Sequence, residues 1–276
     1  MSARSRRPGP TVRVRVTETT DDGERRREDR VATEEPLEIR LAWPGSPASR
    51  VWVTMRTPGH DFELAAGYLL HEGLVGPGDL RTVAYCTDED LSDEEEFNVV
   101  TVTLERPPRR DPGHRHVGSS SGSSACGVCG KDSVSDVLDL ARGERWAGPA
   151  VHADLVRALP ERLRPAQAVF ERTGGVHAAG LFTASGELLV AREDVGRHNA
   201  VDKVTGARLL AGAPVSDACL VVSGRAGFEL VQKAVATGTG ALAAVGVPSS
   251  LSVRLAAESG LALYGWVSGR RCVRYA

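Results

Sequence analysis

Two cysteines separated by two residues are the part of this sequence best suited to covalent chemistry. Cys126 and Cys129 lie in the glycine- and serine-rich stretch 124–130, directly ahead of a short helix expected at 134–140. The amides of a helix N-terminus and the ammonium group of Lys131 both favour the thiolate, which is the nucleophilic form of cysteine. We therefore interpret Cys126 and Cys129 as catalytic residues, with sulfur transfer among the reactions that a reactive thiolate can perform.

The spacing of the two cysteines also serves other chemistry. Thioredoxin-like dithiol exchange uses the same C-x-x-C pattern, but no βαβ unit precedes the pair here. Zinc binding needs two further ligands. The chain has no second cysteine pair, although His114, His116 or His177 could supply a ligand. Two buried structural cysteines fit poorly with so polar a stretch, so redox exchange, zinc binding and sulfur transfer remain open on spacing alone.

Three strand-to-helix turns in the second half of the chain predict an anion-binding site. They lie at 193–199, 223–227 and 248–250 and are rich in small and polar residues. Such turns gather at one rim of an open α/β sheet, where helix N-termini, arginines and serine hydroxyls suit phosphate groups. Each turn alone also fits helix capping, and His177 also fits a core or capping role. The predicted cofactor contacts are Ser223, Arg225, His198, Lys203, His177 and Ser249.

The cysteine pair must be positioned by a first, N-terminal α+β domain, which we place at residues 36–142. Residues 1–35 are predicted to be poorly ordered, apart from an edge strand at 12–16. The unpatterned segment 106–125 predicts a long mobile loop that carries the cysteines. Asp61 fits an N-cap as well as a functional role. Apolar periodicity predicts strands at 37–41, 51–55, 83–86 and 98–104, and a helix at 61–72.

The anion-binding turns belong to a second domain, residues 150–276, beyond a linker at 143–153. Alternating strands and helices are typical of βαβ units and predict a largely parallel sheet with helices on both faces. The fold class is therefore α/β in this domain and α+β overall. The expected strands are 178–183, 188–191, 219–222, 242–245 and 261–266, and the expected helices are 198–210, 228–235 and 251–258.

Composition argues against several classes of protein. The 276 residues are 41% apolar and 25% charged, with a formal net charge of -2. Nothing therefore favours nucleic acid or an anionic membrane as a partner. No apolar run is long enough to span a bilayer and no secretory signal is evident, so we expect a cytoplasmic protein. The three remaining cysteines, Cys86, Cys219 and Cys272, are interpreted as packing residues.

Six ordered segments resemble those of the formate dehydrogenase accessory sulfurtransferases, the FdhD/NarQ family. The resemblance extends over nearly the whole chain, from Leu37 to Tyr275. A single C-x-x-C would be a weak match, whereas the ordered set is specific. The segments are RTPGHD at 56–61, ACGVCGK at 125–131, TGGVHAA at 173–179, REDVGRHNAVDK at 192–203, SGR at 223–225 and PSS at 248–250.

The resemblance implies a sulfur carrier that accepts persulfide sulfur from a cysteine desulfurase. The carrier would pass this sulfur to the bis(molybdopterin guanine dinucleotide) molybdenum cofactor, a bound substrate that formate dehydrogenase requires. The resemblance also implies Cys126 as the persulfide residue with Cys129 assisting, a homodimer, no permanent metal, and a cytidine-deaminase-like three-layer second domain. The alternative function is a zinc-stabilised nucleotide-binding chaperone with structural cysteines. The family's cofactor-binding segment falls on Trp266, Val267, Ser268, Gly269, Arg270 and Arg271, with Trp266 and Ser268 in place of the usual Phe and Arg.

Overall fold

The computed structural model describes residues 7–87, 92, 95–112 and 143–276. The predictions for Cys126, Cys129 and Lys131 lie outside these described residues. The strands are β1 (Thr11–Thr20), β2 (Gly23–Ala32), β3 (Glu35–Trp43), β4 (Ser46–Arg56), β5 (Leu80–Tyr85), β6 (Val99–Leu104), β7 (His177–Phe182), β8 (Leu188–Asp194), β9 (Cys219–Val222), β10 (Ala241–Ala244), β11 (Ala262–Ser268) and β12 (Arg271–Arg274). The helices are α1 (Asp61–His71), α3 (Ala153–Leu163), α4 (Ala168–Thr173), α5 (Arg197–Leu210), α6 (Phe228–Thr237) and α7 (Ser250–Ser259), with a 3-10 turn η2 (Arg164–Ala166).

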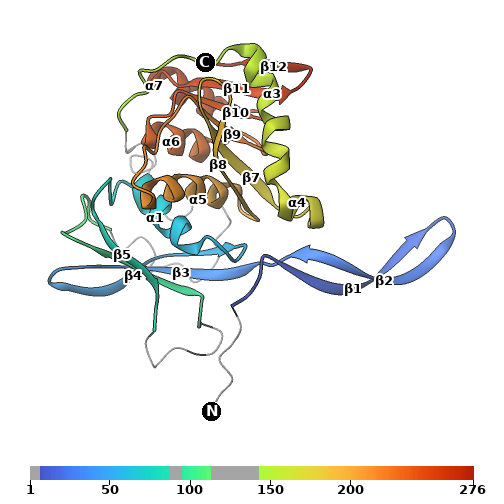
Figure 1. Cartoon of the computed structure of the whole chain (residues 1–276), viewed down its shortest axis with the longest axis horizontal. Helices are drawn as coiled ribbons and strands as arrows, with labels where there is room; N and C mark the ends of the chain where they lie inside the picture. Colours follow the sequence, from blue (N-terminus) through green and yellow to red (C-terminus); the bar gives the residue numbers. More distant parts are fainter. Residues whose placement is uncertain (1–6, 88–91, 93–94, 113–142) are drawn as a thin grey trace.

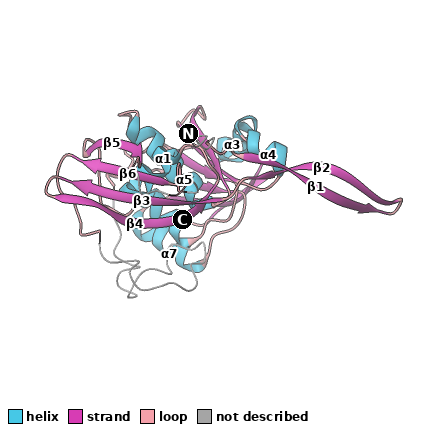
Figure 2. Cartoon of the chain, turned by 90° about the horizontal axis from the view of Figure 1, so that it is seen from below, coloured by secondary structure: helices cyan, strands magenta, loops and turns pink. Residues whose placement is uncertain are grey.

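Three sheets organise the described part of the chain. A six-stranded sheet has the order β12-β11-β10-β9-β7-β8, and a four-stranded sheet has the order β4-β3-β6-β5. Helices α1 and α5 lie between these two sheets (Figure 1). Strands β1 and β2 form a separate antiparallel ribbon that leaves the body of the molecule as an arm, which both views show (Figures 1 and 2). No helix among the described residues is both long and apolar enough to cross a membrane.

The six-stranded sheet is mixed rather than largely parallel. Strands β9, β10 and β11 are parallel, as the βαβ pattern predicts, and α6 and α7 connect them. Strand β7 runs antiparallel to both β8 and β9, and β12 runs antiparallel to β11. The antiparallel strands arise from hairpins at each end of the parallel unit, one of which includes the unpredicted strand β12.

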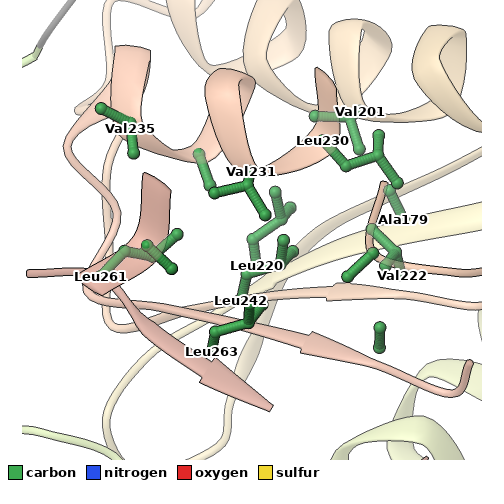
Figure 3. Close-up of a cluster of buried hydrophobic side chains, with 14 of the residues drawn as sticks. Ala179, Val201, Leu220, Val222, Leu230, Val231, Val235, Leu242, Leu261 and Leu263 are labelled. Atoms are coloured by element: carbon green, nitrogen blue, oxygen red, sulfur yellow. The ribbon is translucent and has the colours of Figure 1, made fainter. Parts of the chain in front are cut away.

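Helices cover both faces of this sheet, which confirms the three-layer prediction. Side chains of a strand alternate between the two faces. Leu220 and Val222 therefore point toward α5, α6 and α7, into the apolar cluster drawn in Figure 3. Cys219 and Val221 point the other way, into a second cluster that α3 closes. The specific likeness to cytidine deaminases stays a prediction.

The four-stranded sheet is joined to the larger unit through a close crossing of α1 and α5. One face of α1 packs on the sheet with Leu64 and Leu69. Its other face meets α5, where Gly67 lies against the backbone of Asp202 and Gly206 lies against the backbone of Glu63. A Cβ atom on either glycine would overlap a carbonyl of the opposite helix. Glycine is therefore required for the two backbones to approach so closely.

A buried group of charged side chains lies beside this crossing, and we name it the charged junction (His71, Asp202, Thr205 and Lys233). The Lys233 ammonium donates to Asp202 Oδ1 at 2.7 Å, and His71 Nδ1 lies 2.5 Å from the same oxygen. Thr205 Oγ1 lies 3.1 Å from His71 Nε2. Burial lowers the pKa of His71, and the nearby Lys233 charge adds to this effect. The junction thus ties α1, α5 and α6 together around one carboxylate.

Three predictions need correction. Residues 1–35 are not mostly disordered, because residues 11–32 form the β1–β2 ribbon. Helices α3 and α4 follow the predicted linker and were not expected. Of the two alternatives for Asp61, the N-cap is wrong, since His60 takes that position at φ 58° and the Asp61 carboxylate accepts bonds from Arg56 and Tyr85. The division into domains at 36–142 and 150–276 stays a prediction.

Candidate functional site

The predicted turns meet at one edge of the six-stranded sheet. Strands β8, β9, β10 and β11 end at this edge and β7 begins there, because β7 runs opposite to its two neighbours. Backbone hydrogen bonds connect successive loops, from Trp266 N to Gly246 O at 3.0 Å and from Gly246 N to Gly224 O at 2.9 Å. We name this edge the rim (residues 177, 194–198, 223–225, 246–249 and 266–271).

A group of basic side chains occupies the β7–β8–β9 part of the rim. The partly buried His177 ring faces Gly224, on which a Cβ atom would lie 3.4 Å from Nδ1. Burial lowers the pKa of His177, and the charges of Arg197 and His198 lower it further. Arg197 Nε is buried and has no hydrogen-bond partner among the described residues. The rim thus combines an imidazole whose pKa is lowered with a guanidinium whose hydrogen-bonding capacity is not filled.

Two helix N-termini add to this positive region. Helices α5 and α6 begin at the rim with Gly196 and Gly227 as N-caps, and glycine has no side chain to cap the first amides. Exposed Arg225 stands in the turn before α6. By contrast, α7 is capped in the ordinary way, since Ser249 Oγ accepts a bond from Ser252 N. The α5 and α6 ends are therefore the better anion-binding positions.

His198 has a partner that sequence reasoning missed. Its Nε2 lies 2.8 Å from Glu229 Oε2, and the two side chains are 12% and 13% exposed. A carboxylate beside an imidazole fixes the orientation of the ring and the nitrogen that carries the proton. Glu229 is in the first turn of α6, four residues after Arg225 ends the SGR segment, and its pairing with His198 follows from the packing of α5 and α6.

The predicted contact residue Lys203 directs its side chain into the protein. Its ammonium is buried and lies 2.6 Å from Asp194 Oδ2 and 2.8 Å from Thr57 O. Asp194 also accepts bonds from the backbone of Thr57 and Gly196 and from the side chain of Asn199. These bonds fix the turn ahead of α5 and connect it to the RTPGHD segment. Lys203 is therefore a positioning residue beneath the rim.

Two predicted serine contacts hold the protein backbone. Ser223 Oγ accepts a bond from Ala178 N at 2.9 Å and so fixes the start of β7. Ser249 caps α7, with its Oγ 2.7 Å from Ser252 Oγ. Neither geometry requires a ligand, so both residues shape the rim through the backbone.

The segment 266–271 also reaches the rim, with its residues in different roles. Trp266 is 49% exposed at φ 52°, a left-handed conformation that is uncommon for a non-glycine residue. The Arg271 guanidinium lies 5.0 Å from the centre of its indole ring. The Val267 side chain is buried in the core and cannot contact a ligand, and Gly269 lies against Glu161. Exposed Ser268 and Arg270 flank these positions.

The three described cysteines, Cys86, Cys219 and Cys272, are buried or partly buried. Burial raises the pKa of Cys219 to about 12, so this thiol stays protonated. Cys86 and Cys272 are partly buried, and Arg40 approaches the Cys86 sulfur at 3.6 Å. Among the described residues no group of three His, Cys, Asp or Glu side chains is placed to hold a metal ion.

The fold is a mixed α+β architecture with a basic rim on its six-stranded sheet, and comparison with known proteins gives the family of the chain. The model of the FdhD/NarQ family matches residues 32–276, so the chain belongs to this family. A Streptomyces avermitilis relative named sulfur carrier protein FdhD is 48% identical, covering 96% of this chain and 94% of the relative. The Mycobacterium tuberculosis protein of the same name is 46% identical, covering 94% of each chain.

A solved structure has the same fold. It comes from Desulfotalea psychrophila and was assigned as a formate dehydrogenase accessory protein. It superposes with a TM-score of 0.73, covers 96% of this chain and 97% of its own, and is 21% identical in sequence. The mixed α+β architecture is therefore shared at low sequence identity.

Proposed function

We propose that this chain is a sulfur carrier for the maturation of formate dehydrogenase, with persulfide sulfur carried on Cys126. The name of the close relatives, sulfur carrier protein FdhD, supports the general role. The observation in this chain that supports it best is the rim. The Arg197 guanidinium, with its Nε unpartnered among the described residues, and two glycine-capped helix N-termini face one edge, which suits a ligand with several phosphates.

The length of the rim suits the bis(molybdopterin guanine dinucleotide) molybdenum cofactor as substrate. Neighbouring strands lie about 4.8 Å apart, so β8 and β11 end roughly 19 Å from each other. That span fits an extended nucleotide. At the β11 end, the exposed Trp266 ring offers a stacking surface for a guanine base. At the other end, His177, Arg197 and Arg225 meet phosphate groups.

The two cysteines account for the transfer without an external oxidant. The Cys126 thiolate attacks the outer sulfur of the donor persulfide, the donor S–S bond breaks, and the donor leaves as a thiolate. Cys129 thiolate then attacks the inner Cys126 sulfur and displaces the carried sulfur as sulfide. Formation of the Cys126–Cys129 bond supplies the two electrons that reduce this sulfur. A thiol reductant then restores the pair.

The proposal includes partners and a compartment. The sulfur donor is a cysteine desulfurase, the client is formate dehydrogenase, and the chain acts in the cytoplasm as a homodimer. An odd number of cysteines, two of them close together, suits a reducing compartment.

Intact-mass measurement tests the carrier step. Incubation with a cysteine desulfurase and cysteine should add one reducible sulfur atom to the wild type and to Cys86→Ser, a matched control at a partly buried cysteine. Cys126→Ser should accept none. Cys129→Ser should accept sulfur but release little sulfide, because the displacing thiol is missing. A wild type that never gains sulfur would sink the proposal.

The zinc-stabilised chaperone is the second candidate, and the names of the relatives do not favour it. Elemental analysis separates the two functions. Stoichiometric zinc in the purified wild type, lost together with the fold in Cys126→Ser, would replace the carrier by the chaperone.

A further inference from the structure

The β1–β2 arm is a long ribbon that receives little support from the other described elements. Its strands pair over ten positions, from Thr11 opposite Ala32 to Thr20 opposite Gly23. It extends from the other described elements in both views, and at its base β2 packs on α4 and Ala32 lies beside Gly175 (Figures 1 and 2). A two-stranded ribbon is at best marginally stable by itself in water. The arm therefore points to a partner that covers it.

Strand β2 offers the partner an open edge. One edge of β2 pairs with β1, and among the described residues no strand pairs with the other. Residues 23–28 are all exposed, and β2 contains no proline to block pairing. A long exposed edge strand is a template for another strand. The charges along β2 indicate which strand would pair with this edge.

The charges of β2 are complementary to a second copy of β2 in reverse. Two β2 strands, each with the sequence GERRREDRVA, can be aligned antiparallel with Arg27 opposite Arg27. In this register each charged residue from 24 to 30 other than Arg27 lies opposite a residue of the opposite charge. Shifting the register by two residues in either direction brings Glu24 opposite Glu28 or Arg26 opposite Arg30, and a one-residue shift exchanges the faces. The facing pairs in the favoured register are Glu24 with Arg30, Arg25 with Asp29, and Arg26 with Glu28.

The central position of this register places two Arg27 side chains opposite one another. Each Arg27 already holds counter-charges of its own chain, with Nε 3.2 Å from Glu18 Oε1 and Nη1 3.1 Å from Asp29 Oδ1. The like charges at the symmetry axis are thereby offset. The remaining six facing positions attract, so the edge prefers a copy of itself.

We propose that two copies of this chain pair through the open edges of their β2 strands, antiparallel about Arg27, to form a four-stranded sheet β1-β2-β2-β1. The contact is isologous, since each β2 gives and receives the same pairs about a two-fold axis. This proposal rests on the homodimer of the proposed function and names its surface. It also explains the arm, because the partner ribbon supplies the strands that the isolated hairpin lacks.

Charge exchange in the full-length protein tests the pairing, with sedimentation equilibrium as the measurement. Arg26→Glu and Glu28→Arg each place like charges at two facing positions and should weaken self-association at least tenfold. The double variant Arg26→Glu/Glu28→Arg restores both pairs and should recover it. A mixture of the two single variants should form a heterodimer. Arg81→Glu, an exposed position on the edge strand β5, is the matched control and should associate like the wild type.

The outcomes separate the arm from the dimer itself. A wild type that stays monomeric at all concentrations overturns both the homodimer and the β2 pairing. If Cys126 of that monomer still accepts sulfur, the carrier function is unaffected. A wild-type dimer that tolerates Arg26→Glu and Glu28→Arg overturns the β2 pairing alone. Weakened single variants without recovery in the double variant also overturn it, since the charges then face other groups.

Discussion

The charged junction and the rim contain the same types of residue and use them in opposite ways. At the junction, the Lys233 ammonium and the His71 ring both lie within 2.7 Å of Asp202 Oδ1, and all three side chains are buried. At the rim, Arg197 Nε has no partner among the described residues and Arg225 is exposed. Asp202 Oδ2 at the junction also lacks a hydrogen-bond partner among these residues, but the other oxygen of this carboxylate is bonded to a cation. Buried charges are tolerated only when paired. The difference shows that the partners of a charge, more than its residue type, separate a stabilising cluster from a ligand site.

Removing the junction lysine should give the largest loss of stability. Lys233→Met keeps the length of the side chain but leaves the buried Asp202 charge without its cation, and we expect a loss of about 3–5 kcal/mol in the free energy of unfolding. Urea denaturation at pH 7.5 measures it. Ligand binding at the rim, where the variant still folds, should stay close to that of the wild type.

A double variant controls for the loss of packing. Asp202→Asn/Lys233→Met removes both charges, so it should recover part of the stability lost in Lys233→Met. If the double variant loses as much stability, relative to the wild type, as Asp202→Asn and Lys233→Met lose together, the two side chains are not coupled and the junction is not an ionic cluster.

The helix crossing beside the junction should be the next most sensitive feature. Gly67→Ala adds a Cβ atom that overlaps the backbone of Asp202, so the helices must separate. We expect a loss of about 1–3 kcal/mol, although alanine alone favours a helix over glycine by about 1 kcal/mol. Chemical denaturation measures the loss. Gly175→Ala, where the added atom would lie 3.6 Å from Ala32 Cβ, should be nearly neutral.

The rim should respond in the opposite manner, with binding lost and stability kept. Arg225→Ala removes an exposed guanidinium, so the free energy of unfolding should change by less than about 0.5 kcal/mol. The affinity for guanosine diphosphate, a probe for one half of the cofactor, should fall about tenfold because a charge-assisted hydrogen bond is lost. Calorimetric titration measures the affinity, and chemical denaturation measures the free energy of unfolding. The control is Arg254→Ala, at an exposed position on α7. An equal loss of affinity in this variant would show that the effect is not specific to the rim.

Local patterns predicted the elements of the second domain well. The helix expected at 198–210 is α5, and the strand expected at 219–222 is β9, because apolar periodicity and small turn residues agree there. The turns were correctly placed on one rim for the same reason. The arm was missed because residues 11–32 bury almost nothing, and its alternating charges resemble those of a disordered tail.

Roles at the rim were harder to predict than the location of the rim. Lys203 is in a site-like segment, yet its side chain points inward to Asp194, and the sequence does not show direction. Ser223 and Ser249 bond to backbone atoms, as these residue types often do. Glu229 was missed because its pairing with His198 joins two different helices. Sequence patterns identify segments, whereas partner choice depends on tertiary packing.

The smallest effect should be a pH dependence that belongs to the junction alone. Burial lowers the pKa of His71, whereas the unfolded chain takes up this proton near the ordinary value of about 6.5. The unfolded state therefore binds more protons as the pH falls below 6.5, and the free energy of unfolding should decrease by up to about 1.4 kcal/mol per pH unit. His71→Gln lacks the titrating ring, so its stability should fall less steeply between pH 7 and pH 5.5. Other histidines, including His177 at the rim, titrate in both proteins and cancel in the difference. Parallel urea titrations at four pH values give the two slopes, and identical slopes would mean that His71 does not hold its neutral form in the folded junction.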